Sequence, residues 1–263
     1  MQGFVHLHVH TYYSILDGMS PIPRLVEKAA GNGMRGLAVT DHGNMFGIKE
    51  LFDCCADLNK KRKEEGLEPL KPIAGCEMYV AKSKEEKNKD EKPFHLIVLA
   101  KNLTGYHNLV KLVSRSWTDG FYHRPRTDRK DLEEFHEGLI ICSACIAGEV
   151  PAKILNNDLA GAREAIEWYH GIWGEDYYLE LQRHTNPNAN PNIRYNHETF
   201  PLQQQANKVL LQLAEEYGIK VMQSQSPAGG GWALLMSIAF KKVVFKKLRI
   251  SRIIRIICEI CVR

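Results

Sequence analysis

The sequence predicts an α/β fold whose strands are mainly parallel. Short apolar runs alternate along the chain with stretches whose apolar residues recur at helical spacing, which is typical of a sheet covered by helices. Residue types that bind metals lie near the ends of several apolar runs, where chemistry collects in parallel sheets and barrels. With 263 residues, 44% of them hydrophobic, the chain suits one large α/β domain or two small ones.

The first half of the chain begins with a strand at 4–9, where apolar residues alternate with histidines. A helix follows, because Ser20 can cap it, Pro21 suits its first turn and the apolar residues up to Ala30 have helical spacing. The next predicted elements are a strand at 36–40, a helix at 48–58 and a strand at 73–80. Residues 82–92 are dense in both charges, which indicates a solvated loop.

The second half repeats the alternation of strand and helix. Its predicted strands lie at 95–101, 139–145, 177–182 and 219–222, and its predicted helices at 106–117, 159–172 and 203–217. Residues 186–196 are rich in Asn and Pro and are expected to form a loop. We expect a cytoplasmic protein without a membrane partner, because seven cysteines occur without a signal peptide or an apolar run of the roughly 20 residues that span a bilayer.

The net charge of +4 is unevenly distributed along the chain. Residues 222–263 hold eight Lys or Arg and one acid, whereas residues 1–221 hold 27 bases and 30 acids, a net charge of −3. The main part of the chain therefore lacks a global basic surface for nucleic acid. Any contact with nucleic acid must be local, or must run through bound metal.

The composition changes after Val221, where a low-complexity break leads into a segment with basic residues every three to four positions. One interpretation is a basic amphipathic helix that lies on a membrane surface. We favour the other, in which residues 222–263 are an aberrant basic tail that arose by frameshift or truncation. Residues 1–221 are then the native domain.

The N-terminal strand contains three alternating histidines, His6, His8 and His10. Residues two apart on a strand point to the same face, so His8 and His10 can hold one metal together, and so can His6 and His8. One such pair would prove little. Three alternating histidines in an apolar strand, followed by further ligand-type residues, favour a metal site.

Further residues of ligand type lie near the ends of other predicted strands. They are Asp17 in the loop after the first strand, Asp41 and His42 after the second, Glu77 late in the third, His95 and Cys145. His95 fits less well, because it begins its strand. Taken singly, His42, Glu77 and Cys145 would more often be a structural histidine, an ion-pairing acid and a core residue. Their joint recurrence favours a shared site.

The chemistry of this residue set points to phosphate esters. Imidazole, carboxylate and thiolate together suit borderline divalent ions such as zinc or manganese. Ions about 3.5–4 Å apart can activate a water molecule and stabilise the leaving oxygen of a phosphate ester. A nearby segment, FYHRPRTD, contains Arg124 and Arg126 between aromatic residues. It could contact a phosphate backbone, or it could be an ordinary turn around Pro125.

Several motifs together resemble the PHP domain, named for polymerase and histidinol phosphatase, that begins bacterial DNA polymerase III alpha subunits. They are FVHLHVHTYYSILDG, TDHGNMFG, GCEMY, HLIVLAKN, GFYHRPRTD and CSACIAGEV. The resemblance runs through about residue 221. It implies a distorted seven-stranded β/α barrel with up to three divalent ions, and in metal-retaining members a 3′–5′ exonuclease activity.

The resemblance also implies a set of site residues in this chain. The implied metal ligands are His8, His10, Asp17, His42, Glu77, His95 and Cys145. We treat His6 as a residue that supports the ligands, and Asp41, Arg124 and Arg126 as residues that support them or contact DNA. No catalytic residue beyond the metal ligands is expected.

One departure from the family pattern concerns the end of the barrel. The family has an Asn-Asp-x-His segment after a strand like GIKV, whereas here Met222, Gln223 and Ser224 follow. Two family ligands are therefore missing, and we expect an apparently incomplete barrel with little activity in this chain.

Three functional hypotheses follow from these patterns. The first is a fragment of the replicative polymerase with a metal-dependent exonuclease site, whose partners are DNA and, for the whole protein, the proofreading exonuclease subunit and the sliding clamp. The second is a structural and interaction module without catalysis. The third is a free-standing phosphatase for small phosphate esters, which the polymerase-type motifs disfavour.

Overall fold

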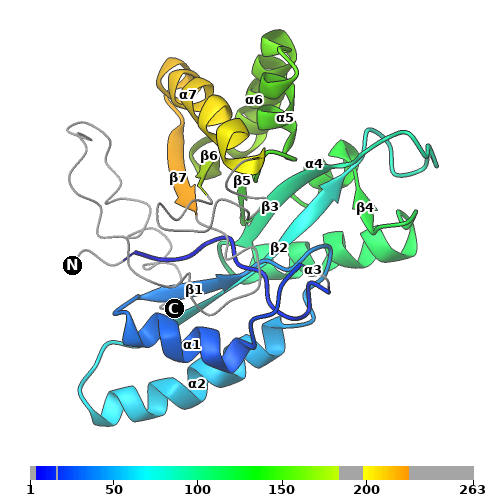
Figure 1. The fold of residues 1–263 in the computed structure, drawn as a ribbon. Helices are drawn as coiled ribbons and strands as arrows, with labels where there is room; N and C mark the ends of the chain where they lie inside the picture. The colour runs from blue at the N-terminus through cyan, green and yellow to red at the C-terminus, as the bar shows by residue number, and fades with distance from the viewer. Residues whose placement is uncertain (1–3, 16, 184–197, 225–263) are drawn as a thin grey trace.

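A computed structural model describes residues 4–15, 17–183 and 198–224, and it forms one curved sheet with helices on its outer side (Figure 1). The strand order is β1-β2-β3-β5-β6-β7, and β4 pairs with β2. The strands are β1 (Gly36–Val39), β2 (Lys71–Val80), β3 (Phe94–Ala100), β4 (Arg126–Thr127), β5 (Leu139–Cys142), β6 (Tyr177–Gln182) and β7 (Lys220–Ser224). The predicted α/β class and the barrel-like, seven-stranded sheet are confirmed.

The helices cover the sheet in two groups, with α1 and α2 beside β1 and β2, and α5, α6 and α7 near β5, β6 and β7 (Figure 1). They are α1 (Ile22–Gly31), α2 (Ile48–Glu64), α3 (Leu103–Thr118), α4 (Arg129–Glu134), α5 (Glu149–Leu155), α6 (Leu159–Trp173) and α7 (Phe200–Tyr217). The side chains of Asn102, Asp128 and Asp158 cap α3, α4 and α6 by accepting a backbone N–H three residues on, which explains why these helices begin there.

Strand β3 runs against its neighbours, whereas the other pairs in the sheet are parallel. Its first residues therefore lie at the edge where the parallel strands end. His95 pairs with Tyr79 near the end of β2, and Gly75 pairs with Leu99. The reversal explains why His95, although it begins its strand, lies on the same edge as the other ligand-type residues.

The interior of the curved sheet is filled by side chains from every long strand and from the N-terminal segment. This cluster comprises Leu7, Ala38, Ile73, Ile97, Leu99, Ile140, Cys142, Ala144, Tyr178 and Met222. One or two residues from each strand are enough to fill the interior, because a small barrel is just wide enough for its own side chains.

The N-terminal segment at 4–9, predicted as a strand, lies extended along β1 instead of forming a full strand. Its backbone contacts are a bridge between His6 and Leu37, and hydrogen bonds from the Ala38 and Thr40 N–H groups to the carbonyls of His6 and Val9. It nevertheless contributes Leu7 to the interior. His8 and His10 still both face Glu77, as strand alternation predicts for residues two apart.

Strand β7 continues beyond the predicted domain boundary at Val221. Leu179 pairs with Val221 and Gln182 with Ser224, so residues 222–224 form the end of β7. The predicted loop at 186–196 and residues 225–263 lie outside the described residues. Within the described ranges, no helix has both the length and the apolar character needed to cross a membrane.

Candidate metal centre

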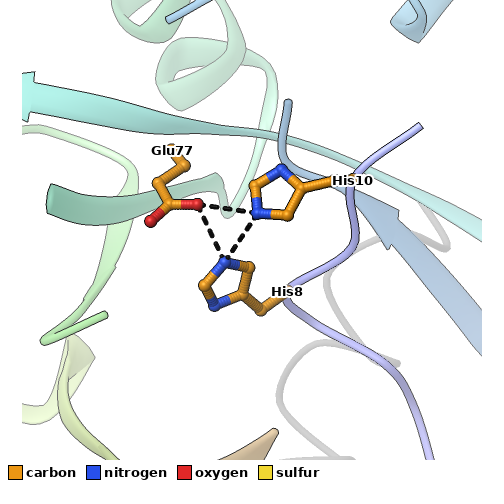
Figure 2. Close-up of side chains that lie close together, drawn as sticks. All are labelled: His8, His10 and Glu77. Carbon is orange, nitrogen blue, oxygen red and sulfur yellow. Dashed lines mark hydrogen bonds and ion pairs between the residues drawn. The ribbon is translucent and has the colours of Figure 1, made fainter. Parts of the chain in front are cut away.

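Three side chains from two distant segments converge at one edge of the sheet, as Figure 2 shows. His8 and His10 come from the extended N-terminal segment, and Glu77 comes from β2. The Nε2 atoms of His8 and His10 lie 2.9 and 2.8 Å from Glu77 Oε2, and 3.2 Å from each other. All three side chains are buried, so their polar atoms contact one another instead of water.

The other carboxylate oxygen of Glu77 faces a second group of donors. His95 Nδ1 lies 2.7 Å from Glu77 Oε1, and Cys145 Sγ lies 3.9 Å from that oxygen and 3.7 Å from His95 Nδ1. The turn that carries Cys145 closes at Gly148, where a Cβ atom would lie 2.0 Å from the carbonyl oxygen of Ser143. Only glycine fits this approach, and the hydrogen bond from the His95 N–H to the Ala147 carbonyl holds the turn beside His95.

Asp17 and His42 form a third group. Asp17 Oδ2 lies 2.8 Å from His42 Nε2, and the rings of His42 and His10 stack with centroids 4.3 Å apart. In the part of the chain that the structure describes, the Nδ1 atom of His42 is buried, has no hydrogen-bond partner and lies 3.6 Å from Glu77 Oε2. A buried imidazole nitrogen without a partner is uncommon unless something else binds it.

These contacts bring all the predicted ligand residues together around Glu77. Ligand atoms lie within 4.8 Å of one another in three overlapping trios: His8, His10 and Glu77; His10, Asp17 and His42; His42, Glu77 and His95. The donor set fits a borderline divalent ion, because it combines imidazole and carboxylate with a nearby thiol. A shared cation would also satisfy the two facing Nε2 atoms and the unpartnered Nδ1 atom. The assignment of each ligand and the identity of the metal stay predictions.

The charges of the centre are strongly coupled. Burial by itself lowers the pKa of His8, but the carboxylates of Glu180 and Glu77 outweigh it and raise the pKa well above its usual value. Burial alone would raise the pKa of Glu77, yet the charge of His8 and the hydrogen bonds from the histidines hold it well below its usual range. His8 therefore carries a proton in the metal-free centre. A cation must displace that proton, so its affinity should increase with pH.

Two further ligand candidates have shifted pKa values of opposite sign. The hydrogen bond from His42 lowers the pKa of Asp17, which keeps this carboxyl group ionised. Burial raises the pKa of the Cys145 thiol well above its usual value. Cys145 is therefore a neutral thiol until a cation binds, and its deprotonation adds to the pH dependence of binding.

Asp41 supports the centre from behind, through the turn that follows His10. Its Oδ1 atom accepts hydrogen bonds from the Thr11 backbone N–H at 2.6 Å and from Ser14 Oγ at 2.8 Å. Ser14 Oγ lies in turn 3.3 Å from His10 Nδ1. Asp41 thus holds the turn that orients His10.

Glu180 on β6 is a supporting residue that the sequence analysis did not single out. Its Oε1 atom accepts hydrogen bonds from His8 Nδ1 at 2.8 Å and from Ser224 Oγ, and its Oε2 atom is buried without a partner among the described residues. A carboxylate on Nδ1 fixes the orientation and tautomer of the ring, so that Nε2 of His8 faces Glu77. The available signal was a single acid between Leu179 and Leu181 in an otherwise apolar strand.

We expect Glu180→Gln to lower the zinc affinity of the full chain by about 10- to 100-fold, the usual effect of losing a partner behind a metal-binding histidine. The measurement is competition with a chromophoric chelator. The matched control is Glu149→Gln, since Glu149 is also buried but bonds to Arg129, Lys153 and Tyr169 instead of a centre histidine. Equal losses of affinity in both variants would contradict a specific role for Glu180.

The remaining predicted residues differ in what they can do. His6 is half-buried, burial lowers its pKa to about 4, and its ring contacts Phe4 at 4.8 Å. Arg126 is buried and donates hydrogen bonds to the carbonyl oxygens of Gly120, Glu86 and Lys84. The predicted DNA contact is therefore wrong for Arg126, because its guanidinium already donates hydrogen bonds to the backbone of these loops.

Arg124, two residues earlier, is exposed beside the centre. Its guanidinium lies over the Tyr79 ring at 4.9 Å, and that ring stacks on His42 with centroids 5.6 Å apart. The guanidinium of Arg124 is therefore accessible to a phosphate.

A comparison with protein families decides the assignment. The model of the PHP domain matches residues 6–184, a range that includes every predicted ligand. The chain belongs to the PHP family. The resemblance inferred from the motifs is confirmed, since its PHP domain is homologous to curated proteins named DNA polymerase III subunit alpha.

These relatives are much longer than the chain. The protein from Borreliella burgdorferi is 46% identical over 185 residues, which cover 69% of this chain and 15% of the relative. The protein from Aquifex aeolicus is 35% identical over 233 residues, covering 85% and 18%, and the one from Thermus aquaticus is 38% identical over 223 residues, covering 82% and 16%. The chain thus spans about 15 to 18% of the length of these PHP-containing proteins.

Among solved structures, the chain is similar to a candidate metal-dependent phosphoesterase from Bifidobacterium adolescentis. The TM-score is 0.49 at 16% identity, and the match covers 88% of this chain and 91% of the other. At this level of likeness, the assignment to the PHP family depends on the sequence matches and on the strands described above.

Proposed function

We propose that the centre hydrolyses the terminal phosphodiester bond at a DNA 3′ end, as the metal-dependent exonuclease part of a replicative polymerase. The observation that supports it is the convergence of imidazole, carboxylate and thiol groups on Glu77. The names of the relatives suggest DNA as the substrate. For the whole protein we propose a replicase as the setting, with the proofreading exonuclease subunit and the sliding clamp as partners.

The residues of the centre have distinct tasks in this proposal. His8, His10 and Glu77 would hold one part of the ion cluster, and His42, His95, Asp17 and Cys145 the rest. When bound, divalent ions activate water and neutralise phosphate charge. Asp17 remains a carboxylate because of its lowered pKa, so it serves as a ligand and not as a proton donor. The exposed guanidinium of Arg124 would contact the phosphate next to the bond that breaks.

The proposed reaction is a balanced hydrolysis. The oxygen of water bonds to phosphorus, and the bond between phosphorus and the 3′ oxygen of the preceding nucleotide breaks. The departing oxygen takes up a proton, which leaves a 3′ hydroxyl group on a strand that is one nucleotide shorter. The other product is a 5′ mononucleotide.

The test is an assay of the purified full chain with Mn²⁺ and a 5′-labelled single-stranded oligonucleotide. We expect slow, metal-dependent release of single nucleotides, and we expect His10→Ala to remove it because His10 contacts Glu77. His107→Ala is the matched control, since His107 is exposed on α3. A product ladder that persists in His10→Ala would refute the proposal.

Two other outcomes would favour the alternatives. If the chain binds metal tightly and releases no nucleotide, and EDTA lowers its melting temperature, the centre is a structural one. If the chain hydrolyses histidinol phosphate but leaves the oligonucleotide intact, it acts as a phosphatase for small esters. In either case the exonuclease proposal fails.

A further inference from the structure

We propose that three exposed aromatic side chains beside the centre form a stacking platform for the bases of single-stranded DNA. The aromatic platform consists of Phe46, Trp117 and Phe121. The inference rests on the proposed function and deepens it, because it says how a strand is held while its end lies at the centre.

The rings of the aromatic platform lie against one another and remain open to solvent. Their exposed fractions are 65% for Phe46, 43% for Trp117 and 48% for Phe121. The rings of Trp117 and Phe121 stack with centroids 5.4 Å apart and an interplanar angle of 19°, and the Phe46 ring lies 6.4 Å from the Trp117 ring at an angle of 37°. Exposed aromatic rings are what successive bases stack on in proteins that bind single strands.

The aromatic platform is tied to the centre through Gly43, the residue after His42. Trp117 Nε1 donates a hydrogen bond of 2.8 Å to the Gly43 carbonyl oxygen, and the Gly43 N–H donates one of 2.9 Å to the carbonyl of Glu77. Gly43 has a φ of +61°, and a Cβ atom there would lie 2.5 Å from Pro125. The close approach that only glycine allows thus brings the loop of Phe121 and Arg124 against the loop of His42.

A cationic group lies beside the centre, three residues along the chain from Phe121. Arg124 is exposed, and within residues 4–15, 17–183 and 198–224 its guanidinium makes a ring contact with Tyr79 and no ion pair. Tyr79 itself stacks on His42. An unpaired guanidinium can contact a phosphate, while neighbouring aromatic rings take the attached bases.

This chemistry favours nucleic acid over a protein as the occupant. The aromatic platform is built of three exposed flat rings, and the exposed guanidinium of Arg124 lies three residues after Phe121. Residues 1–221 carry a net charge of −3, so a strand would be held by a local site of this kind and not by general attraction.

The test measures binding in EDTA, where hydrolysis cannot occur, by the fluorescence anisotropy of labelled oligothymidylate added to the full chain. We expect Phe46→Leu and Phe121→Leu each to weaken binding by about 5-fold or more, because leucine keeps apolar bulk but loses the flat ring. Arg124→Gln should weaken binding and reduce its salt dependence by about one phosphate contact. Phe52→Leu is the matched control, since Phe52 is 44% exposed on α2 outside the aromatic platform.

The outcomes separate this inference from the proposed function. Binding that depends on the aromatic platform but leads to no nucleotide release with Mn²⁺ would leave the inference standing and refute the exonuclease. Equal affinities for Phe121→Leu and Phe52→Leu would refute the aromatic platform. If oligothymidylate does not bind and sedimentation shows self-association that Phe121→Leu abolishes, the surface is a protein interface and the inference is wrong.

Discussion

Replacing Glu77 by glutamine is expected to lower the zinc affinity of the chain by more than about 100-fold, beyond the loss for a residue that only supports a ligand. Both carboxylate oxygens are in use, since Oε1 faces His95 and Oε2 faces His8 and His10. An amide has one acceptor oxygen, so its NH₂ group would face one of these two groups of donors. The variant therefore disrupts the centre on one side whichever way the amide turns.

The measurement is zinc affinity by chelator competition, made on Glu77→Gln, Glu180→Gln and the exposed surface variant Glu164→Gln in parallel. We expect the losses to rank in that order, with Glu164→Gln unchanged because it lies on the solvent face of α6. A loss in Glu77→Gln no larger than in Glu180→Gln would mean that Glu77 is not the shared ligand.

Arg126→Met is expected to lower the free energy of unfolding by about 3 kcal/mol, the scale of losing charge-assisted hydrogen bonds in a buried site. Its side chain is 3% exposed, and it donates to the carbonyl oxygens of Gly120, Glu86 and Lys84. Methionine fills much of the volume but donates nothing. The loops at 84–86 and around Gly120 then lose the group that holds both of them.

Arg124→Met is the matched control from the same loop, since Arg124 is exposed and bonds to no backbone carbonyl within the described ranges. We expect it to change stability by less than about 0.5 kcal/mol. The measurement is urea unfolding in EDTA, so that metal binding does not contribute. Arg126→Lys should rescue little, because one ammonium group cannot reach three carbonyls as a planar fork does. Similar stabilities for Arg126→Met and Arg124→Met would contradict this account.

The apolar pattern predicted the long strands well, because the apolar residues that mark each strand are neighbours in the sequence. The strand predicted at 73–80 occurs as β2 (Lys71–Val80), and the one at 177–182 as β6 (Tyr177–Gln182). The short helices α4 (Arg129–Glu134) and α5 (Glu149–Leu155) were missed, because six or seven residues are too few to establish a helical period.

Strand direction could not be predicted from the pattern, since an apolar run is the same in either direction. His95 was therefore judged a weak candidate, although the reversal of β3 places it within 2.7 Å of Glu77. Glu180 was missed for a related reason. Its partner His8 is 172 residues away, and only the closure of the sheet shows that the two side chains meet.

That separation has a consequence for how the protein is made. His8 leaves the ribosome long before Glu180, and β6 must pair with β5 before the Glu180 carboxylate can reach the His8 ring. Contacts between such distant residues form late, because the intervening chain must first lose its freedom. His8 must therefore remain without its Glu180 partner until the chain has grown past β6, and zinc present at that stage would meet the imidazole before its supporting carboxylate is in place.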